Sequence, residues 1–448
     1  MIHPYMRLSV ALGVLLSLSL HGENWPQWRG PLGTGVSAET GLPTTWSNST
    51  NIAWKTPLRG LGVSAPIAWG DMVFVTSQIG AGAFRPGTHP TLVQGPDAAT
   101  SGERPLGGAR RQDDPGAKVA FVVTAFRRQD GRLLWEYQLT AEGDLPAVHE
   151  KRNLAASSPV TDGERVYAWF SNGQIVAVDM KGNPVWTRHL GRELSTFDVD
   201  WGHASSPALF RDRLILPCYE GSFATLLALD TRTGKQVWRV DAEKGLKSHS
   251  TPLIIETPQG PELIVNSTER VEAFDPATGK QLWQFVDPNR FAIPTPVYHD
   301  GVIYTTRGYR SGPYAAIRAG GRGDVSKSQM LWRIATGAPY ISSLVYYDGL
   351  LYMASELGIV TVIDPKTGEP VWRERLGGFY SASPVAGDGK IYLLSETGEM
   401  LVLRAGRTPQ VLARNKLDEQ CVASPAISGR QILIRSAQHL IAIGAGQK

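Results

Sequence analysis

The chain has 448 residues, of which 42% are hydrophobic and 48 are glycine, and it carries a formal net charge of +4. This apolar content excludes a disordered or fibrous chain, and the mild, mixed charge does not suggest nucleic-acid binding, which usually comes with clustered Lys and Arg. The length alone predicts about three domains, but an internal repeat overrides that estimate.

The N-terminus has the pattern of a secretory signal peptide. Arg7 precedes the apolar stretch 8–20, and the polar residues His21–Glu23 follow it. The apolar stretch is shorter than a membrane span. We therefore expect a signal peptide over residues 1–22, an N-terminal extension over 23–50, and a mature chain that is periplasmic or secreted and has no transmembrane segment.

A phrase that ends in tryptophan recurs along the rest of the chain. It reads ALDTRTGKQVW at Ala228–Trp238, AFDPATGKQLW at Ala273–Trp283 and VIDPKTGEPVW at Val362–Trp372. A second phrase occurs eight times along the chain: one or two small residues, most often Ser, followed in seven units by Pro, then an apolar run and in several units an Asp-Gly turn. A period of about 40–50 residues is typical of propellers and solenoids.

Each unit reads as four short strands. The Ser/Pro phrase begins the first strand, a tight turn leads to the second, a polar loop leads to the third, and Thr-Gly turns the chain into a fourth that ends at Trp. We therefore expect an all-β fold over residues 51–448, an eight-bladed β-propeller of four-stranded antiparallel blades. The last unit, Cys421–Ile443, has three strands, so we expect Asn51–Leu58 with Trp54 to supply its fourth strand.

The repeated phrase itself predicts a structural role. In one copy Asp230 can accept hydrogen bonds from local backbone N–H groups, Gly234 supplies a positive φ, and Trp238 offers its ring to the seam between blades. A catalytic group is seldom needed in so many equivalent copies. Catalytic or ligand-binding residues are therefore expected on the loops.

The phrase A-x-D-x-x-T-G-x-x-x-W resembles the repeat of the pyrroloquinoline-quinone (PQQ) family over essentially the whole mature chain. That family contains quinoprotein dehydrogenases and non-catalytic propellers such as the outer membrane protein assembly factor BamB. The segment Asn24–Gly35, NWPQWRGPLGTG, also resembles exported PQQ-like propellers known mainly from genome sequences. The resemblance implies the propeller fold, and PQQ with calcium would be the cofactor if the chain were a dehydrogenase.

Several patterns argue against familiar catalytic and metal sites. The dehydrogenases of the family carry adjacent cysteines against the cofactor, whereas Cys218 and Cys421 are far apart here, which also makes a disulfide framework unlikely. HEKRN at 149–153 lacks the second histidine of H-E-x-x-H, and the pair Asp198 and Asp200 lacks the rest of an EF-hand loop. No metal site is assigned.

The candidate site lies on one face of the propeller. Loops between second and third strands, and loops between blades, open on the same face, and they are long at 80–118, 140–155, 191–203 and 307–315. The first of these is an insertion that is interpreted either as a lid or as a disordered loop. The RGD motif at Arg322–Asp324 is expected in a turn on the other face, with no adhesion role.

The expected ring around the channel mouth comes from counting back four residues from the proline of each blade, or from Leu344, which takes the place of proline in the sixth unit. This position holds large side chains in three blades, with His249 one residue away. The candidate ligand-binding residues, taken with the long loops, are His149, Glu150, Arg152, Asn153, Asp198, Asp200, Trp201, His203, His249, Tyr309, Arg310, Tyr340 and Tyr380. Alternatively, these side chains only form hydrogen bonds and ion pairs with one another within the long loops, and they bind no ligand.

Two functions remain open from the sequence. The first is an exported, non-catalytic scaffold, expected to be monomeric, that binds a protein or a small ligand through its loop-rich face. The second is a quinoprotein-like oxidoreductase acting on alcohols or sugars.

Overall fold

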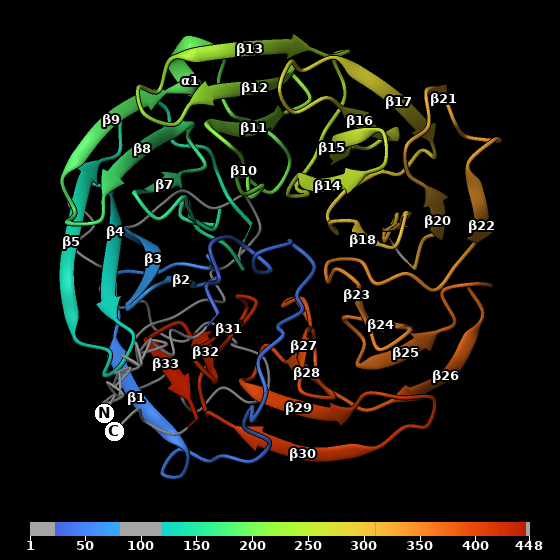
Figure 1. Ribbon diagram of the computed structural model, residues 1–448. Coiled ribbons are helices and arrows are strands. Elements are labelled where there is room, and N and C mark those ends of the chain that lie inside the picture. The colour runs from blue at the N-terminus through green and yellow to red at the C-terminus, as the bar shows by residue number, and fades with distance from the viewer. Residues whose placement is uncertain (1–22, 81–117, 150, 310, 445–448) are drawn as a thin grey trace, which may run out of the picture.

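The computed structural model describes residues 23–80, 118–149, 151–309 and 311–444. These residues form eight antiparallel sheets arranged as the blades of a propeller around a central channel (Figure 1). The predicted signal peptide at 1–22 and nearly all of the 80–118 insertion lie outside the described residues. Within the described residues, no helix is both long and apolar enough to span a membrane.

The first four blades follow the predicted order of strands. Blade 1 contains β2 (Ile67–Trp69), β3 (Met72–Ile79), β4 (Ala120–Arg127) and β5 (Leu133–Thr140). Blade 2 contains β6 (Val160–Thr161), β7 (Arg165–Trp169), β8 (Gln174–Asp179) and β9 (Pro184–His189), followed by the short helix α1 (Leu190–Glu193). Blade 3 contains β10 (Ala208–Phe210), β11 (Arg213–Tyr219), β12 (Ala224–Asp230) and β13 (Gln236–Asp241). Blade 4 contains β14 (Leu253–Thr257), β15 (Gly260–Asn266), β16 (Arg270–Phe274) and β17 (Gln281–Val286).

The second half of the ring repeats the same order. Blade 5 contains β18 (Val297–His299), β19 (Val302–Thr306), β20 (Tyr314–Arg318) and β22 (Met330–Ile334). Blade 6 contains β23 (Val345–Tyr347), β24 (Leu350–Ala354), β25 (Ile359–Ile363) and β26 (Pro370–Arg375). Blade 7 contains β27 (Val385–Gly387), β28 (Lys390–Leu394), β29 (Glu399–Arg404) and β30 (Val411–Lys416).

Blade 8 is built from both ends of the described chain. Its strands β31 (Ala426–Ser428), β32 (Gln431–Arg435) and β33 (His439–Ile443) are completed by β1 (Ile52–Pro57), which pairs antiparallel with β33. Figure 1 shows β1 in blue beside β33 in red. The predicted closure is confirmed, and it leaves no unpaired blade edge at this point of the ring.

The repeated tryptophans join neighbouring blades at the outer rim. Trp238 donates its indole N–H to the carbonyl of Pro276 in the next blade at 3.1 Å, and a Cβ on Gly279 of that blade would lie 2.8 Å from the Trp238 ring. The Thr-Gly turn therefore requires glycine for two reasons, its φ of +76° and this close ring contact. Equivalent bonds are made by Trp54, Trp135, Trp186, Trp332 and Trp372, which confirms the structural role of the phrase.

Two outer seams depart from this pattern. At the seam of blades 4 and 5, Trp283 donates instead to Glu262 at 2.9 Å, and β21 (Gly323–Asp324) pairs in parallel with β17 as a fifth strand. The RGD motif thus lies in the β20–β22 connection and ends in a strand against blade 4, where we expected only a turn. In blade 7, Ala413 occupies the position that holds tryptophan in the other fourth strands. Trp46 of the N-terminal extension belongs to the hydrophobic cluster against which Ala413 packs.

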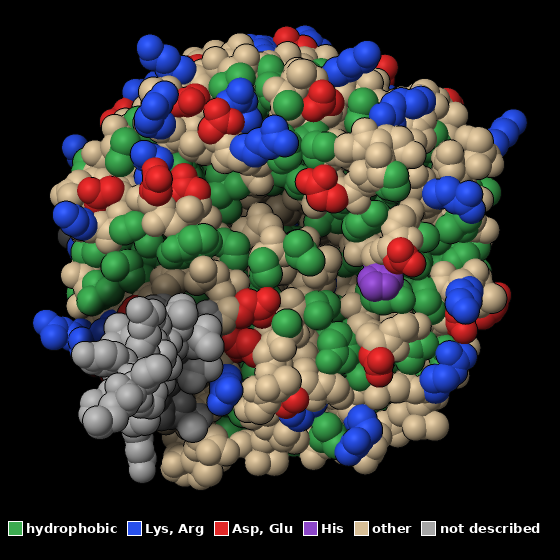
Figure 2. Space-filling model, viewed as in Figure 1, with side chains coloured by type: hydrophobic (Ala, Val, Ile, Leu, Met, Phe, Trp, Pro, Cys, Tyr) green, Lys and Arg blue, Asp and Glu red, His purple; other side chains and the backbone are tan. Residues whose placement is uncertain are grey.

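The N-terminal extension crosses the propeller face that carries the turns between first and second strands. Trp25 exchanges two backbone hydrogen bonds with Ala68 of blade 1, at 2.8 and 2.9 Å. Ser37 donates its backbone N–H to Ala386 of blade 7 at 2.9 Å. Figure 1 shows this segment in blue over the inner ends of the blades, and Figure 2 shows the same face, with Lys and Arg mostly toward the rim. Residues 23–46 therefore form a floor at one end of the channel.

Candidate functional site

A ring of hydrogen bonds surrounds the channel and joins the first strands of consecutive blades. Seven of the eight units have a proline just before or at the first strand, and blade 6 has Leu344 at the same position. The residue before this position is Ser or Thr in seven units and Ala65 in the first. The N–H of this residue donates to the hydroxyl of its equivalent in the next blade. Seven such bonds, of 2.9–3.1 Å, run from Ala65 to Ser424. Ala65 has no hydroxyl, so the eighth bond of this kind cannot form.

Side-chain alternation decides which residues face the channel, and it corrects the expected ring. Residues one and three positions before the proline face the same way because the chain is extended. Residues four positions before it, including His203 and Tyr380, point between the blades and are 1% and 2% exposed. The residues three positions before the proline or its equivalent face the channel, so the predicted ring was placed one residue too early in each unit. Of its large side chains, all of them in the described residues, only Tyr340 lines the channel pocket.

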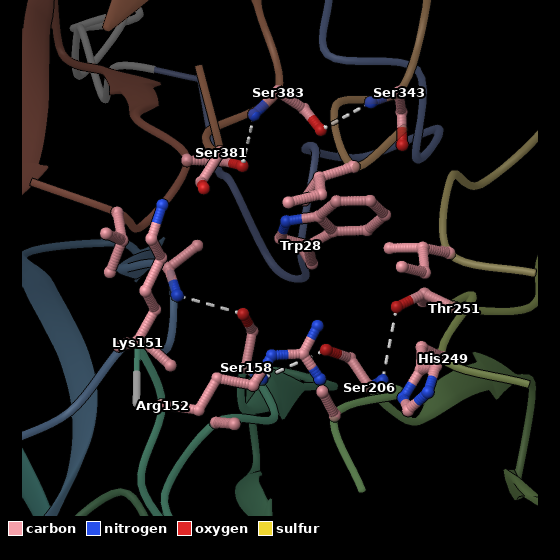
Figure 3. Close-up of a pocket in the computed structure, with 18 of the residues that line it drawn as sticks. Trp28, Lys151, Arg152, Ser158, Ser206, His249, Thr251, Ser343, Ser381 and Ser383 are labelled. Atoms are coloured by element: carbon pink, nitrogen blue, oxygen red, sulfur yellow. Dashed lines mark hydrogen bonds between the residues drawn. The ribbon is translucent and has the colours of Figure 1, made fainter. Parts of the chain in front are cut away.

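A pocket of about 320 Å³ occupies the channel above the floor. The connections between blades contribute His149, Lys151, Arg152, Trp201 and Tyr340 to its walls. The floor contributes Trp28, whose ring points into the pocket beside the hydroxyls of the inner ring (Figure 3). The channel-facing positions add Val63, Ala65, Ala156, Ser158, Ala204, Ser206, His249, Thr251, Ile293, Ile341, Ser343, Ser381, Ser383, Val422 and Ser424.

The charged groups of the pocket are cationic. Arg152 keeps part of its surface exposed at the mouth, yet burial of its guanidinium lowers its pKa to about 10. Burial and the charge of Arg152 hold the pKa of His249 well below its ordinary value of 6.5, so this imidazole is neutral at pH 7. Lys151 pairs with both oxygens of Glu396 at 2.8 and 2.9 Å. No described residue that lines the pocket is Asp or Glu.

The loops before blades 2 and 3 meet at the mouth, as expected. The ring of His149 lies 5.0 Å from that of Trp201 in an edge-on arrangement, and the His149 N–H donates to the Trp201 carbonyl at 3.2 Å. A Cβ on Gly202 would lie 2.9 Å from a methyl carbon of Val148, so the backbones pack closely. His149 and His203 thus belong to one loop cluster on one face of the propeller.

His203 is held away from the pocket by a buried network. Its Nδ1 lies 2.7 Å from Glu220 Oε1, and both side chains are fully buried. Its ring also packs 4.1 Å from the Trp169 ring, while the second Glu220 oxygen accepts the Val199 N–H at 3.0 Å. These contacts position the loop at 191–203. They agree with the alternative in which the loop residues only form interactions with one another.

The other predicted residues that the structure describes also lie outside the pocket lining. Asp198 accepts a hydrogen bond from Ser222 at 2.7 Å, and Asp200 pairs with Lys247 at 2.6 Å. Asn153 is 5% exposed and accepts the N–H of Ala155. Tyr309 packs edge-on against Tyr340 at 5.4 Å, and Glu150 and Arg310 lie outside the described residues.

Sequence reasoning missed three parts of this pocket. Trp28 lies in an extension whose path over the floor only the fold reveals. Lys151 reaches the pocket beside the predicted His149 and Arg152. The inner ring had a readable signal, a hydroxyl residue before the proline or its equivalent Leu344 in seven of eight units. This signal combined with strand alternation would have placed His249 in the channel.

Comparison with known proteins fits this architecture. A family model described as outer membrane protein assembly factor BamB matches residues 36–195, 171–319 and 322–407. The chain belongs to this family. No curated protein matches it.

Solved structures share the fold at low identity. BamB from Moraxella catarrhalis is 15% identical, with a TM-score of 0.53 over 73% of this chain and 90% of that one. Quinohemoprotein alcohol dehydrogenase from Comamonas testosteroni is 10% identical, with a TM-score of 0.64 over 95% and 81%. A europium-containing methanol dehydrogenase is 12% identical, with a TM-score of 0.62 over 94% and 89%. Identities this low show the fold alone.

The pocket residues do not fit PQQ held with calcium. Calcium takes six to eight oxygen ligands and favours carboxylates, whereas the described pocket lining offers cations and hydroxyls. Among all described residues, no group of three His, Cys, Asp or Glu is placed to hold a metal ion. Cys218 lies in blade 3 and Cys421 precedes blade 8, and both are buried with free thiols. We therefore derive no step through this cofactor.

Proposed function

We propose that this chain is an exported, non-catalytic binding protein that takes its ligand or partner at the face where the connections between blades converge. The observation that carries this proposal is the channel pocket. Three connections, those with Arg152, Trp201 and Tyr340, meet over one rigid ring of hydrogen bonds. Functional groups on loops over a rigid scaffold are the usual arrangement of a binding site.

The chemistry of the pocket supports recognition. Hydroxyls, aromatic rings and guanidinium groups bind polar and flat groups with little rearrangement, because the ring fixes the backbone on which they stand. Two exposed apolar side chains lie beside the mouth on the same face, Leu357 and Phe379, each 59% exposed. They offer a contact area for a partner, in keeping with the assembly-factor name of the family.

Export to the periplasm or beyond is part of the same proposal. The pattern at 1–22 supports it, together with a family described as an outer membrane protein assembly factor. The quinoprotein alternative has the shared fold of the two dehydrogenases in its favour, but the donor set of the pocket does not support it.

Site-specific photo-crosslinking in cells tests the proposal. A photoreactive residue at Leu357 or Phe379 should give adducts, whereas one at Leu32, which is 72% exposed in the floor segment, should not. In parallel, purified protein with PQQ and calcium should not reduce a redox dye in the presence of alcohols or sugars. Dye turnover, or adducts from Leu32 alone, would overturn the proposal.

A further inference from the structure

The first residue that the structure describes is bound by a carboxylate of the same floor segment. The backbone N–H of Glu23 donates to Oε1 of Glu39 at 2.6 Å. The Glu39 carboxylate also accepts the N–H groups of Gly429 at 2.8 Å and Arg430 at 2.6 Å, which lie in the turn between β31 and β32. Glu39 therefore joins residue 23 to the blade that closes the ring.

The backbone around residue 23 is held at neighbouring points as well. Ser428 donates its hydroxyl to the Glu23 carbonyl at 2.6 Å. The side chain of Asn24 accepts the Gly70 N–H at 2.8 Å. These bonds to blades 8 and 1 fix the position of the residue 23 nitrogen relative to Glu39.

The charges beside this nitrogen are negative. The Glu23 side chain accepts the Ser37 hydroxyl at 2.5 Å and the Ala38 N–H at 3.2 Å. Glu23 and Glu39 are both half-buried, and neither forms an ion pair with a Lys, Arg or His of the described residues. Two half-buried carboxylates of like charge gain from a positive charge placed beside them.

One arginine of blade 1 lies at the edge of this cluster. Arg128 donates to the Ser428 hydroxyl at 3.2 Å, and its guanidinium pairs with Asp71 at 3.7 Å. Its charge is therefore directed to a third carboxylate. A cation at the residue 23 nitrogen would be in direct contact with Glu39.

Export would create a cation at this nitrogen, because the expected signal peptide ends at residue 22. Hydrolysis of the Gly22–Glu23 peptide bond by a signal peptidase consumes one water. The new carboxyl group of Gly22 releases a proton, and the new amine of Glu23 takes one up. A neutral amide N–H donates one hydrogen bond, whereas an ammonium group is charged and donates three.

We infer that removal of the signal peptide at the Gly22–Glu23 bond converts the hydrogen bond between Glu23 and Glu39 into an ammonium–carboxylate ion pair, which locks the floor segment onto blade 8. This inference rests on the export part of the proposed function. Hydrogen bonds between charged groups are stronger than neutral ones. The floor, residues 23–46, is therefore held more firmly in the processed protein than in its precursor.

N-terminal sequencing of the exported protein tests the cleavage position and should give Glu23 as the first residue. Amide exchange tests the lock, by comparison with a chain that carries one alanine inserted before Glu23. The insertion keeps an ammonium group but moves it one residue away from Glu39. At pH 7 the N–H groups of Trp25 and Gly429 should exchange about threefold or more slowly in the protein without the insertion.

Two substitutions show whether Glu39 causes this difference. Glu39→Gln should bring the exchange ratio of the two chains to one, since it removes the charge that pairs with the ammonium group. Asp388→Asn is the matched control, because Asp388 also holds the floor segment, by accepting the Leu42 N–H at 3.0 Å. It should leave the exchange ratio unchanged. The insertion alone decides the test if Glu39→Gln fails to fold.

The exchange ratio should also depend on pH. An unpaired α-ammonium group loses its proton at about pH 8, and the carboxylates of Glu23 and Glu39 oppose that loss. The slower exchange should therefore persist below about pH 8, and the ratio should approach one at about pH 10. Measurement of both chains at each pH cancels the pH dependence of exchange itself.

Three results would overturn the inference: a ratio of one at pH 7, equal effects of Glu39→Gln and Asp388→Asn on the ratio, or an exported protein whose first residue is not Glu23. Its failure is distinguishable from failure of the proposed function. A chain that keeps residues 1–22 and is not exported would overturn the export proposal, whereas an exported chain with a ratio of one would overturn the lock alone.

Discussion

The outer rim and the inner ring both join neighbouring blades, but they do so with different groups. At the rim a buried indole donates to a carbonyl and packs on a glycine, so the seam combines a hydrogen bond with a large apolar contact. At the channel a small hydroxyl accepts one N–H and leaves a polar surface. The rim therefore supplies more of the stability, and the inner ring shapes a cavity that can bind a ligand.

The irregular seams show how this chain compensates where a repeated group is missing. At the seam of blades 4 and 5, Arg307 is fully buried and donates to the Thr268 carbonyl at 3.1 Å and to Asn266. At the seam of blades 8 and 1, where Ala65 interrupts the inner ring, the buried Arg435 donates to Ser64 at 2.6 Å. In both places one buried arginine with several donors joins two neighbouring blades, and at the seam of blades 8 and 1 it does so where the inner-ring bond is missing.

Removal of the closing strand should have the largest effect. A chain that begins after Leu58 loses β1 and its pairing with β33, which exposes a blade edge, and it also loses the floor of the channel. We expect aggregation of this chain, whereas a chain that begins at Glu23 should stay monomeric. Size-exclusion chromatography measures the difference, and equal solubility of both chains would contradict the closure.

Loss of one rim tryptophan should be the next largest effect. Trp238→Ala should lower the free energy of unfolding by about 3–5 kcal/mol, as expected for a large buried aromatic. Val237→Ala, at a neighbouring residue that is 40% exposed, should change it by less than about 0.5 kcal/mol. Urea unfolding measures both variants. A change in Trp238→Ala as small as the change in Val237→Ala would contradict the structural role of the phrase.

Acid should destabilise the channel through His249. Its pKa is lowered in the folded protein by burial and by the charges of Arg152, His203 and Lys247, opposed by Asp200. The unfolded chain therefore binds this proton first, and stability falls as the pH drops below about 6.5, by up to about 1.4 kcal/mol per pH unit. His249→Leu should reduce that slope in urea unfolding between pH 7.5 and 5.5. An unchanged slope would assign the acid sensitivity to other groups.

Completion of the inner ring of hydrogen bonds should have the smallest effect, and this effect should be a gain in stability. Ala65→Ser places a hydroxyl where the Ser424 N–H can donate, which should stabilise the protein by about 0.5–1.5 kcal/mol. Ala156→Ser is the matched control, because it adds a hydroxyl to the channel at a position outside the ring. A melting temperature that rises equally in both variants would show that the ring bond itself contributes nothing.

The fold was largely predictable because its signals are local. Thr-Gly turns, alternating apolar residues and a tryptophan in most fourth strands predicted the strands and the structural role of Trp238. The missing strand of the last unit predicted closure by Asn51–Leu58. The seam of blades 4 and 5 departs from this because blade 5 lacks the phrase. There, β21 pairs with the neighbouring blade through contacts that no local pattern encodes.

The candidate site was predictable only in part. The sequence placed His149, Arg152 and Trp201 on one loop-rich face, because the direction of successive strands fixes where their loops open. The sequence did not decide which side chains enter the channel, because neighbouring side chains of an extended segment point to opposite sides. His249, three residues before its proline, lines the pocket, whereas His203, four residues before its proline, is buried away from it.

The sequence by itself thus determined the repeat, the blades and the face that carries the long loops, since each depends on residues close together in the chain. Only the tertiary structure decided that Trp28 and Arg152 line the same pocket and that Lys151 is neutralised by Glu396. These contacts join residues from distant blades and from the N-terminal extension. Their charge balance therefore exists only after the ring has closed.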